Sequence, residues 1–75
     1  MTEKQAEIVV AMAENDLNMT RAAEAVFHHY RNVVYHVSEI TRRTGLDPRK
    51  FYDMMQLLPK AEAVLERRNQ DADRQ

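Results

Sequence analysis

The sequence has no cysteine, no tryptophan, one glycine and two prolines among its 75 residues. Without cysteine it can form no disulfide and no thiolate metal site or nucleophile, so a cytoplasmic protein is the simplest expectation. Because glycine and proline are the main breakers of regular structure, helix is the default except near Gly45, Pro48 and Pro59. The chain is long enough for one domain only.

Several classes of function also lack their usual signals. No stretch approaches the roughly 20 apolar residues of a membrane helix, and the acidic N-terminal segment lacks the basic start of a signal peptide. Paired carboxylates, a nucleophile elbow and a glycine-rich phosphate loop are missing, so we expect neither an enzyme nor a cofactor or small-molecule substrate. His29 and His36 are seven residues apart, but without a third suitably spaced ligand we expect no metal site.

The net charge of −1 hides an uneven distribution of charge along the chain. Residues 1–28 carry five acids and two bases, a charge of −3, whereas residues 29–50 carry five bases and two acids, a charge of +3. The remaining 25 residues contribute −1. A basic segment between acidic ones is a weak but usable electrostatic footprint of a nucleic-acid-binding surface.

The apolar spacing predicts an all-α domain at residues 1–68 with four to five short helices, followed by a frayed polar tail at residues 69–75. We expect the first helix to be capped by Thr2, with Gln5 reaching back in a capping box. Thr20 is expected to cap a short second helix that runs to about Val26.

A third helix is predicted from about Tyr30 to Thr44. The inward stripe of this helix is expected to comprise Val33, Val37, Ile40 and Thr44. Gly45 follows as a helix-terminating residue, and two arginines occupy the last turn, where cations are favourable.

A fourth helix is expected with Asp47 as its cap and Pro48 as its first residue. Its predicted core residues are Phe51, Met54, Met55 and Leu58. We expect Tyr52, Met12 and Met19 to fill the core as well. Pro59 should break or kink this helix.

A fifth helix should then resume the chain, with an apolar edge formed by Ala61, Val64 and Leu65. The domain is near the lower size limit for a stable fold, which favours association with a second copy. We therefore expect a homodimer, with this edge as the candidate interface.

The second and third helices have the proportions of a helix-turn-helix, since only about three residues separate them. Ala22, Ala23 and Ala25 leave room for two helices to cross closely. Phe27 stands where such turns usually have glycine, which counts against the motif unless the turn residue needs no positive φ; we expect that it does not.

Polar and aromatic side chains gather on the outward side of the third helix. With Val33 as the inward reference, a rotation of 100° per residue places Arg31, Tyr35, Ser38 and Arg42 within about 40° of the opposite pole. Arginine can donate two hydrogen bonds to guanine O6 and N7, and the other donors suit bases or phosphates. The predicted DNA-binding residues are Thr20, His29, Tyr30, Arg31, Asn32, Tyr35, Ser38 and Arg42.

The segment NMTRAAEAVFHHYRNVVYHVSEITRRTGLDPRKFYDMMQLL, about 41 residues long, resembles the C-terminal helix-turn-helix of PucR- and CdaR-type regulators. It is still more similar to small stand-alone helix-turn-helix proteins of prophages in Gram-positive bacteria. The matching positions are Thr20, Ala22, Ala23, Ala25, Val26, His29, Val33, Val34, Tyr35, His36, Ile40 and the TGLDP element at Thr44 to Pro48. The resemblance implies double-stranded DNA as the partner and a role in transcriptional regulation.

The chain departs from the family pattern at the start of the recognition helix. The family usually has His-Arg-Asn-Thr there, whereas this chain has His29, Tyr30, Arg31 and Asn32. A shift of one residue rotates a side chain by 100°, so the role of this turn carries over but individual base contacts do not. The shift fits an altered sequence preference. It also fits the alternative of a protein-interaction module on a helix-turn-helix scaffold that no longer reads DNA.

Overall fold

A computed structural model describes the backbone of residues 1–73 and the side chains of residues 1–70. It contains four helices and, within the described residues, no strand. The helices are α1 (Glu3–Glu14), α2 (Met19–Ala25), α3 (Tyr30–Thr44) and α4 (Phe51–Asp73). The all-α prediction is confirmed, as are the predicted limits of the third helix, α3.

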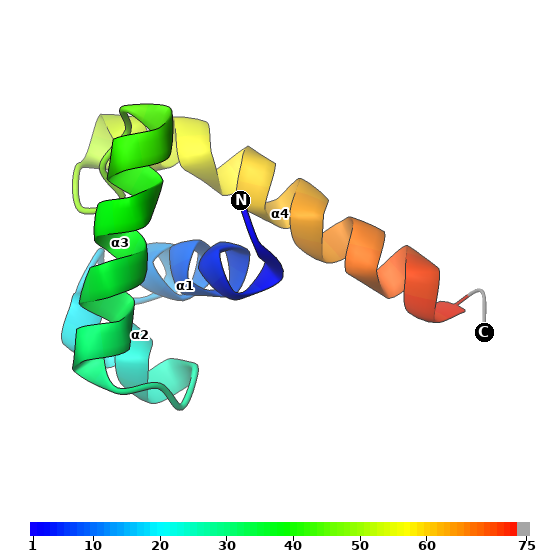
Figure 1. The fold of residues 1–75 in the computed structure, drawn as a ribbon, viewed down its shortest axis with the longest axis horizontal. Helices are drawn as coiled ribbons and strands as arrows, with labels where there is room; N and C mark the ends of the chain where they lie inside the picture. Colours follow the sequence, from blue (N-terminus) through cyan, green and yellow to red (C-terminus); the bar gives the residue numbers. More distant parts are fainter. Residues whose placement is uncertain (74–75) are drawn as a thin grey trace.

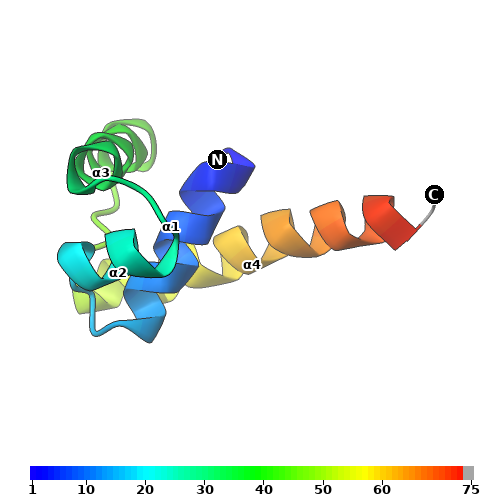
Figure 2. The same cartoon turned by 90° about the horizontal axis from the view of Figure 1, so that it is seen from below.

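Helix α1 lies at the centre of the fold and contacts each of the other three helices. Figure 1 shows α3 lying across α1, with α2 beside the first half of α3. The view in Figure 2 looks almost along α3, which lies on one side of the bundle, while the C-terminal half of α4 extends beyond the other helices. The fold therefore leaves the far side of α3 uncovered.

The start of α1 confirms the predicted capping box. The Thr2 hydroxyl accepts a hydrogen bond from the Gln5 amide, and the Gln5 side chain accepts one from the Thr2 amide, both at 3.1 Å. These bonds satisfy amides that would otherwise lack an acceptor at the helix end. The buried core that α1 helps to form comprises Ala6, Ile8, Val9, Ala11, Met12, Ala22, Ala23, Val33, Val37, Ile40, Met54, Leu57 and Ala61.

Helix α2 begins earlier than predicted. Its N-cap is Asn18, whose side-chain oxygen accepts a hydrogen bond from the Arg21 amide at 3.0 Å. Thr20 is instead an exposed residue inside the first turn, so its predicted capping role is wrong. Both residue types suit a cap, but asparagine ranks above threonine at this position.

The connection from α3 to α4 is a turn where the sequence predicts the start of a helix. The Lys50 amide donates to the Asp47 carbonyl at 3.0 Å, and α4 begins only at Phe51. Asp47 and Pro48 are both buried in this turn. The predicted start of α4 at Pro48 is therefore wrong, because residues 47–50 first form a hydrogen-bonded turn.

Helix α4 is continuous through Pro59, so the predicted break and the separate fifth helix are wrong. Proline removes the hydrogen bond to the carbonyl four residues earlier, which belongs to Met55. Both residues are exposed on the solvent side of the helix, where water can satisfy this carbonyl.

The buried side of α4 is also rotated from the predicted one. Met54, Leu57 and Ala61 are buried, whereas Phe51 is 64% and Met55 57% exposed. Tyr52, expected in the core, is exposed too, and Leu58 is half-buried. Both stripes fit helical spacing between residues 51 and 58. Because the helix continues past the proline, the stripe that extends to Ala61 and packs on α1 is the buried one.

The edge predicted as a dimer interface is occupied by the protein's own α1. Ala61 is fully buried, and Val64 and Leu65 are partly buried against the core. Arg68, one turn further on, forms an ion pair with Glu7 of α1. This face of α4 is therefore not free to pair with a second copy.

The predicted polar tail begins at residue 69. Its backbone continues α4 to Asp73. Residues 74–75 lie outside the described residues, as do the side chains from residue 71 onward.

The turn between α2 and α3 holds Phe27 in a left-handed conformation, with φ of 57°. The expectation that this residue would avoid a positive φ is therefore wrong. Its side chain is 95% exposed, so no buried contact offsets the unfavourable backbone. Ala22 and Ala23 are buried where the helices meet, as their size suggests, whereas Ala25 is exposed.

Replacing Phe27 by glycine should stabilise the fold. The left-handed conformation costs a bulky residue about 1–2 kcal/mol, and glycine removes this cost. Part of the gain is lost because glycine makes the unfolded chain more flexible, which leaves about 0.5–1 kcal/mol. Thermal unfolding followed by circular dichroism should show a rise in Tm of a few degrees. Ala25→Gly, in the last turn of α2, is the control and should lower Tm; a fall for both variants would contradict the strain at Phe27.

Candidate nucleic-acid interface

The candidate interface is the side of α3 that faces away from α1. Val33, Val37 and Ile40 are buried at 3% exposure or less, which fixes the rotation of the helix about its axis. The opposite side carries Arg31, Tyr35, Ser38 and Arg42, all of them exposed. Thr44, predicted to face inward, is exposed, and its hydroxyl donates to the Ile40 carbonyl at 2.7 Å.

The first turn of α3 presents further polar groups. Tyr30 is 49% exposed, and Asn32 and His29 are also exposed. His29 is the N-cap, but its side chain makes no capping hydrogen bond. The first amides of a helix have no acceptor inside the helix, and the helix dipole favours negative charge there. This end of α3 is therefore suited to a phosphate oxygen.

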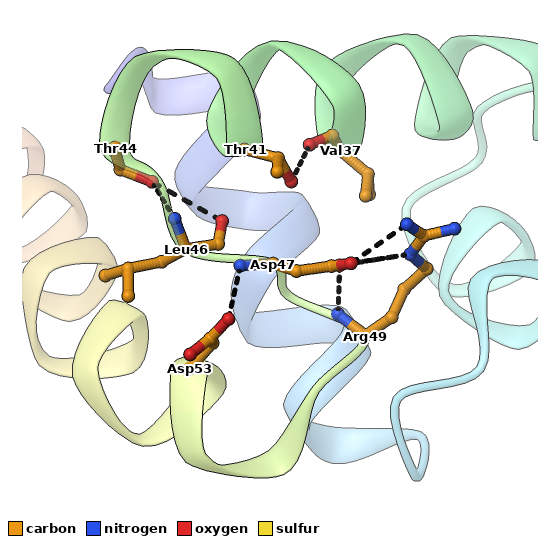
Figure 3. A network of polar contacts seen from close by, with 7 residues as sticks. All are labelled: Val37, Thr41, Thr44, Leu46, Asp47, Arg49 and Asp53. Atoms are coloured by element: carbon orange, nitrogen blue, oxygen red, sulfur yellow. Dashed lines mark hydrogen bonds and ion pairs between the residues drawn. The ribbon is translucent and has the colours of Figure 1, made fainter.

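A network of polar contacts holds the C-terminal end of α3 (Figure 3). Gly45 ends the helix with φ of 75°, as its position after the last periodic residue predicts. The Thr44 hydroxyl then accepts a hydrogen bond from the Leu46 amide at 3.1 Å. Within α3 itself, the Thr41 hydroxyl donates to the Val37 carbonyl at 2.9 Å.

Asp47 is the centre of the network in the connection between α3 and α4. Its carboxylate accepts hydrogen bonds from the Arg49 amide at 2.9 Å and from Nε and Nη2 of the Arg49 side chain at 3.0 and 2.9 Å. Its own amide donates to the Asp53 carboxylate, in the first turn of α4, at 2.9 Å. The side-chain hydrogen bond from Arg49 lowers the pKa of Asp47, although burial opposes the shift. The Asp47 carboxylate thus holds Arg49 within the turn, while the Asp47 amide ties this turn to the start of α4.

Glu39 lies beside the outward face of α3 and pairs with two arginines. Its carboxylate accepts hydrogen bonds from Nη2 of Arg42 at 2.8 Å and from Nε of Arg42 at 3.3 Å. Nε of Arg43 lies 3.5 Å from the same carboxylate. The hydrogen bond from Arg42 is the main cause that lowers the pKa of Glu39 and raises that of Arg42.

His36 is packed at the edge of α3 rather than presented to solvent. Its ring lies edge-on to Tyr35, with centroids 5.3 Å apart, and its Nδ1 is buried without a hydrogen-bond partner in the described part of the protein. Burial lowers the pKa of His36, and the nearby charges of Lys4 and His28 act in the same direction. This histidine therefore favours its neutral form.

The structure brings seven of the eight predicted DNA-binding residues onto α3 and its cap. Thr20 lies apart, on α2, and is exposed. Sequence reasoning did not single out Arg43, Arg49 and Lys50, which are exposed basic residues at the end of α3 and just beyond it. The +3 charge of residues 29–50 was the available signal.

The described residues also bear on two other kinds of site. They contain no group of three or more His, Cys, Asp or Glu side chains placed to hold a metal ion. Across the same residues, no helix is both long and apolar enough to span a membrane.

Comparison with known proteins identifies the family. The family profile for the PucR C-terminal helix-turn-helix domain matches residues 5–59, which include most of α1, all of α2 and α3, and the first part of α4. Curated proteins and solved structures gave no significant match. Since the profile covers most of the chain, and α2 and α3 form a helix pair joined by a short turn, the protein belongs to the family of PucR C-terminal helix-turn-helix domains.

Proposed function

We propose that this protein is a sequence-specific DNA-binding transcriptional regulator whose helix α3 enters the major groove of double-stranded DNA. The observation that carries the proposal is the exposed row of Arg31, Tyr35, Ser38 and Arg42 opposite the buried side of α3. Family membership supports it, because helix-turn-helix domains place their second helix in this groove.

The residues in and beside this row suit different parts of a DNA duplex. Arg31, in the first turn, can donate two hydrogen bonds to guanine O6 and N7, and Tyr30 and Asn32 can reach neighbouring base edges. Further along the helix, the exposed donors suit phosphates, which supply most of the affinity in such complexes. His29 and Thr20 are proposed to contact phosphates on either side of the turn.

The proposal includes a homodimer, because one recognition helix offers little area for specific binding. Its interface must lie away from the α1-covered edge of α4 that contains Ala61. On the resemblance to stand-alone prophage proteins, we further propose a phage-encoded regulator acting in the cytoplasm. Sedimentation at high protein concentration tests the homodimer. A monomer at that concentration would contradict this part of the proposal.

A salt titration of duplex binding tests the proposed function. Retention on an arbitrary duplex should be measurable at low salt and should weaken steeply as salt rises, because each phosphate contact releases counterions. Heparin should compete for the same surface. An absence of binding to both at low salt would contradict the proposal.

One observation favours the alternative of a protein-interaction module. Phe27, Phe51, Tyr52 and Met55 are large apolar residues with more than half of their surface exposed. Large exposed apolar groups are common at protein interfaces. If the protein does not bind DNA at low salt but loses a protein partner when these residues are replaced, the alternative holds.

A further inference from the structure

Most of the positive charge around α3 is already paired within the protein. Residues 29–50 contain five basic side chains, and three of these, Arg42, Arg43 and Arg49, form ion pairs with Glu39 or Asp47. Among the described residues, Arg31 and Lys50 have no such pair. The basic character read from the sequence is thus much reduced at the surface that would meet DNA.

The carboxylates of Asp47 and Glu39 differ in the groups that they bind. Asp47 is buried and bonds the backbone of its own turn as well as Arg49, so the pair is part of the fold. Glu39 holds only side chains of its own helix, Arg42 and Arg43, which are 65% and 68% exposed. Exposed pairs of this kind contribute little to stability and exchange readily with other ions.

The position of Glu39 gives this pair a functional consequence. Its side chain is 21% exposed and lies beside Arg42, one of the four residues on the outward face. A phosphate that approaches Arg42 or Arg43 meets the Glu39 carboxylate beside them, which competes for the guanidinium groups and repels the phosphate. Arg31, at the other end of α3, meets no such competition within the described residues.

We infer that Glu39 restrains binding to non-cognate DNA by occupying the two arginines at the C-terminal end of α3. The inference rests on the proposed function and deepens it. With these arginines held, affinity for an arbitrary duplex is low, because phosphate contacts at this end are weakened. Base contacts from the first turn of α3 then decide which duplex is bound. Glu39 is in this sense a specificity-determining residue.

Glu39→Gln tests the inference, with a short duplex of arbitrary sequence as the probe. Removal of the carboxylate frees Arg42 and Arg43 for phosphates, so the dissociation constant at low salt should fall by about 3- to 10-fold, and the salt dependence should steepen by about one to two units of log Kd per log salt. The matched control is Glu62→Gln. Glu62 is an exposed residue of α4, so this variant changes the net charge equally but should leave the salt dependence near that of the parent.

A second pair of variants separates the local effect from other causes. In a background that carries Arg42→Ala and Arg43→Ala, Glu39→Gln should tighten binding much less, because no arginine is left to release and only the repulsion by the carboxylate is removed. Circular dichroism should show equal helicity in all these proteins. If the parent binds the duplex and Glu39→Gln leaves Kd and its salt dependence unchanged, the restraint is overturned and the proposed function stands. If no protein in the set binds at low salt, both are overturned.

Discussion

Asp47→Ala is expected to lower the free energy of unfolding by about 2–3 kcal/mol, because hydrogen bonds to a charged group contribute about 1.5–3 kcal/mol and Arg49 would be left without its acceptor. For a domain of this size, each 1 kcal/mol corresponds to about 4–8 °C in Tm, so a fall of roughly 10 °C or more should follow. Thermal unfolding monitored by circular dichroism measures it. Glu66→Ala is the control, since Glu66 is an exposed carboxylate of α4. A similar Tm for both variants would contradict the role of Asp47.

The stabilisation by Asp47 should also depend on pH. Its pKa is lower in the folded protein than the ordinary value of 3.8, chiefly because Arg49 donates hydrogen bonds to the ionised form. A carboxyl group with a lowered folded pKa stabilises the fold above its ordinary pKa and loses this effect as the pH falls through the folded value. The difference in unfolding free energy between the parent and Asp47→Ala should therefore be full at neutral pH and shrink below pH 3.8.

Arg31→Ala is expected to lower affinity for a selected DNA site by about 1–3 kcal/mol, which is about 5- to 150-fold. Arg31 is exposed and has no ion pair among the described residues, so the fold should be unaffected. The site is obtained by selection from a randomised duplex pool, and anisotropy then compares it with an arbitrary duplex. Binding to the arbitrary duplex should weaken much less.

The matched control for Arg31→Ala is Arg67→Ala. Arg67 is exposed on α4, so this variant removes the same charge far from α3. It should leave the preference for the selected site intact. Equal losses of affinity for the selected site in the two variants would mean that Arg31 acts only through net charge. The proposal that α3 reads bases would then be wrong.

Helix α3 could be predicted from the sequence because its local signals agree. Val33, Val37 and Ile40 repeat at helical spacing, the polar residues fall on the opposite side, and Gly45 provides a left-handed end. The Thr2 capping box is another local signal and was equally readable. Features that depend on residues close in sequence were therefore predicted well, including the exposure of Arg31 and Tyr35.

Several errors arose where contacts between distant parts of the chain decide the outcome. Two stripes of α4 fit helical spacing, and contact with α1 selects the one that contains Leu57. Phe27 adopts a positive φ in the turn between α2 and α3, which a propensity rule at one residue cannot show. The pairing of Glu39 with Arg42 and Arg43 could have been found, since residues three and four apart meet on a helix. The hydrogen bonds between Asp47 and Arg49 depend on the shape of the turn, so they could not have been found from the sequence.

The most direct test of a DNA-reading α3 is a titration of isotope-labelled protein with its selected duplex, followed by NMR of the backbone amides. If α3 reads DNA, the largest changes in amide chemical shift should occur from His29 to Arg42, on the exposed side of α3, and the amides around Tyr52 and Met55 should change little. Shifts concentrated around Tyr52 and Met55, or an absence of shifts at low salt, would contradict DNA reading by α3.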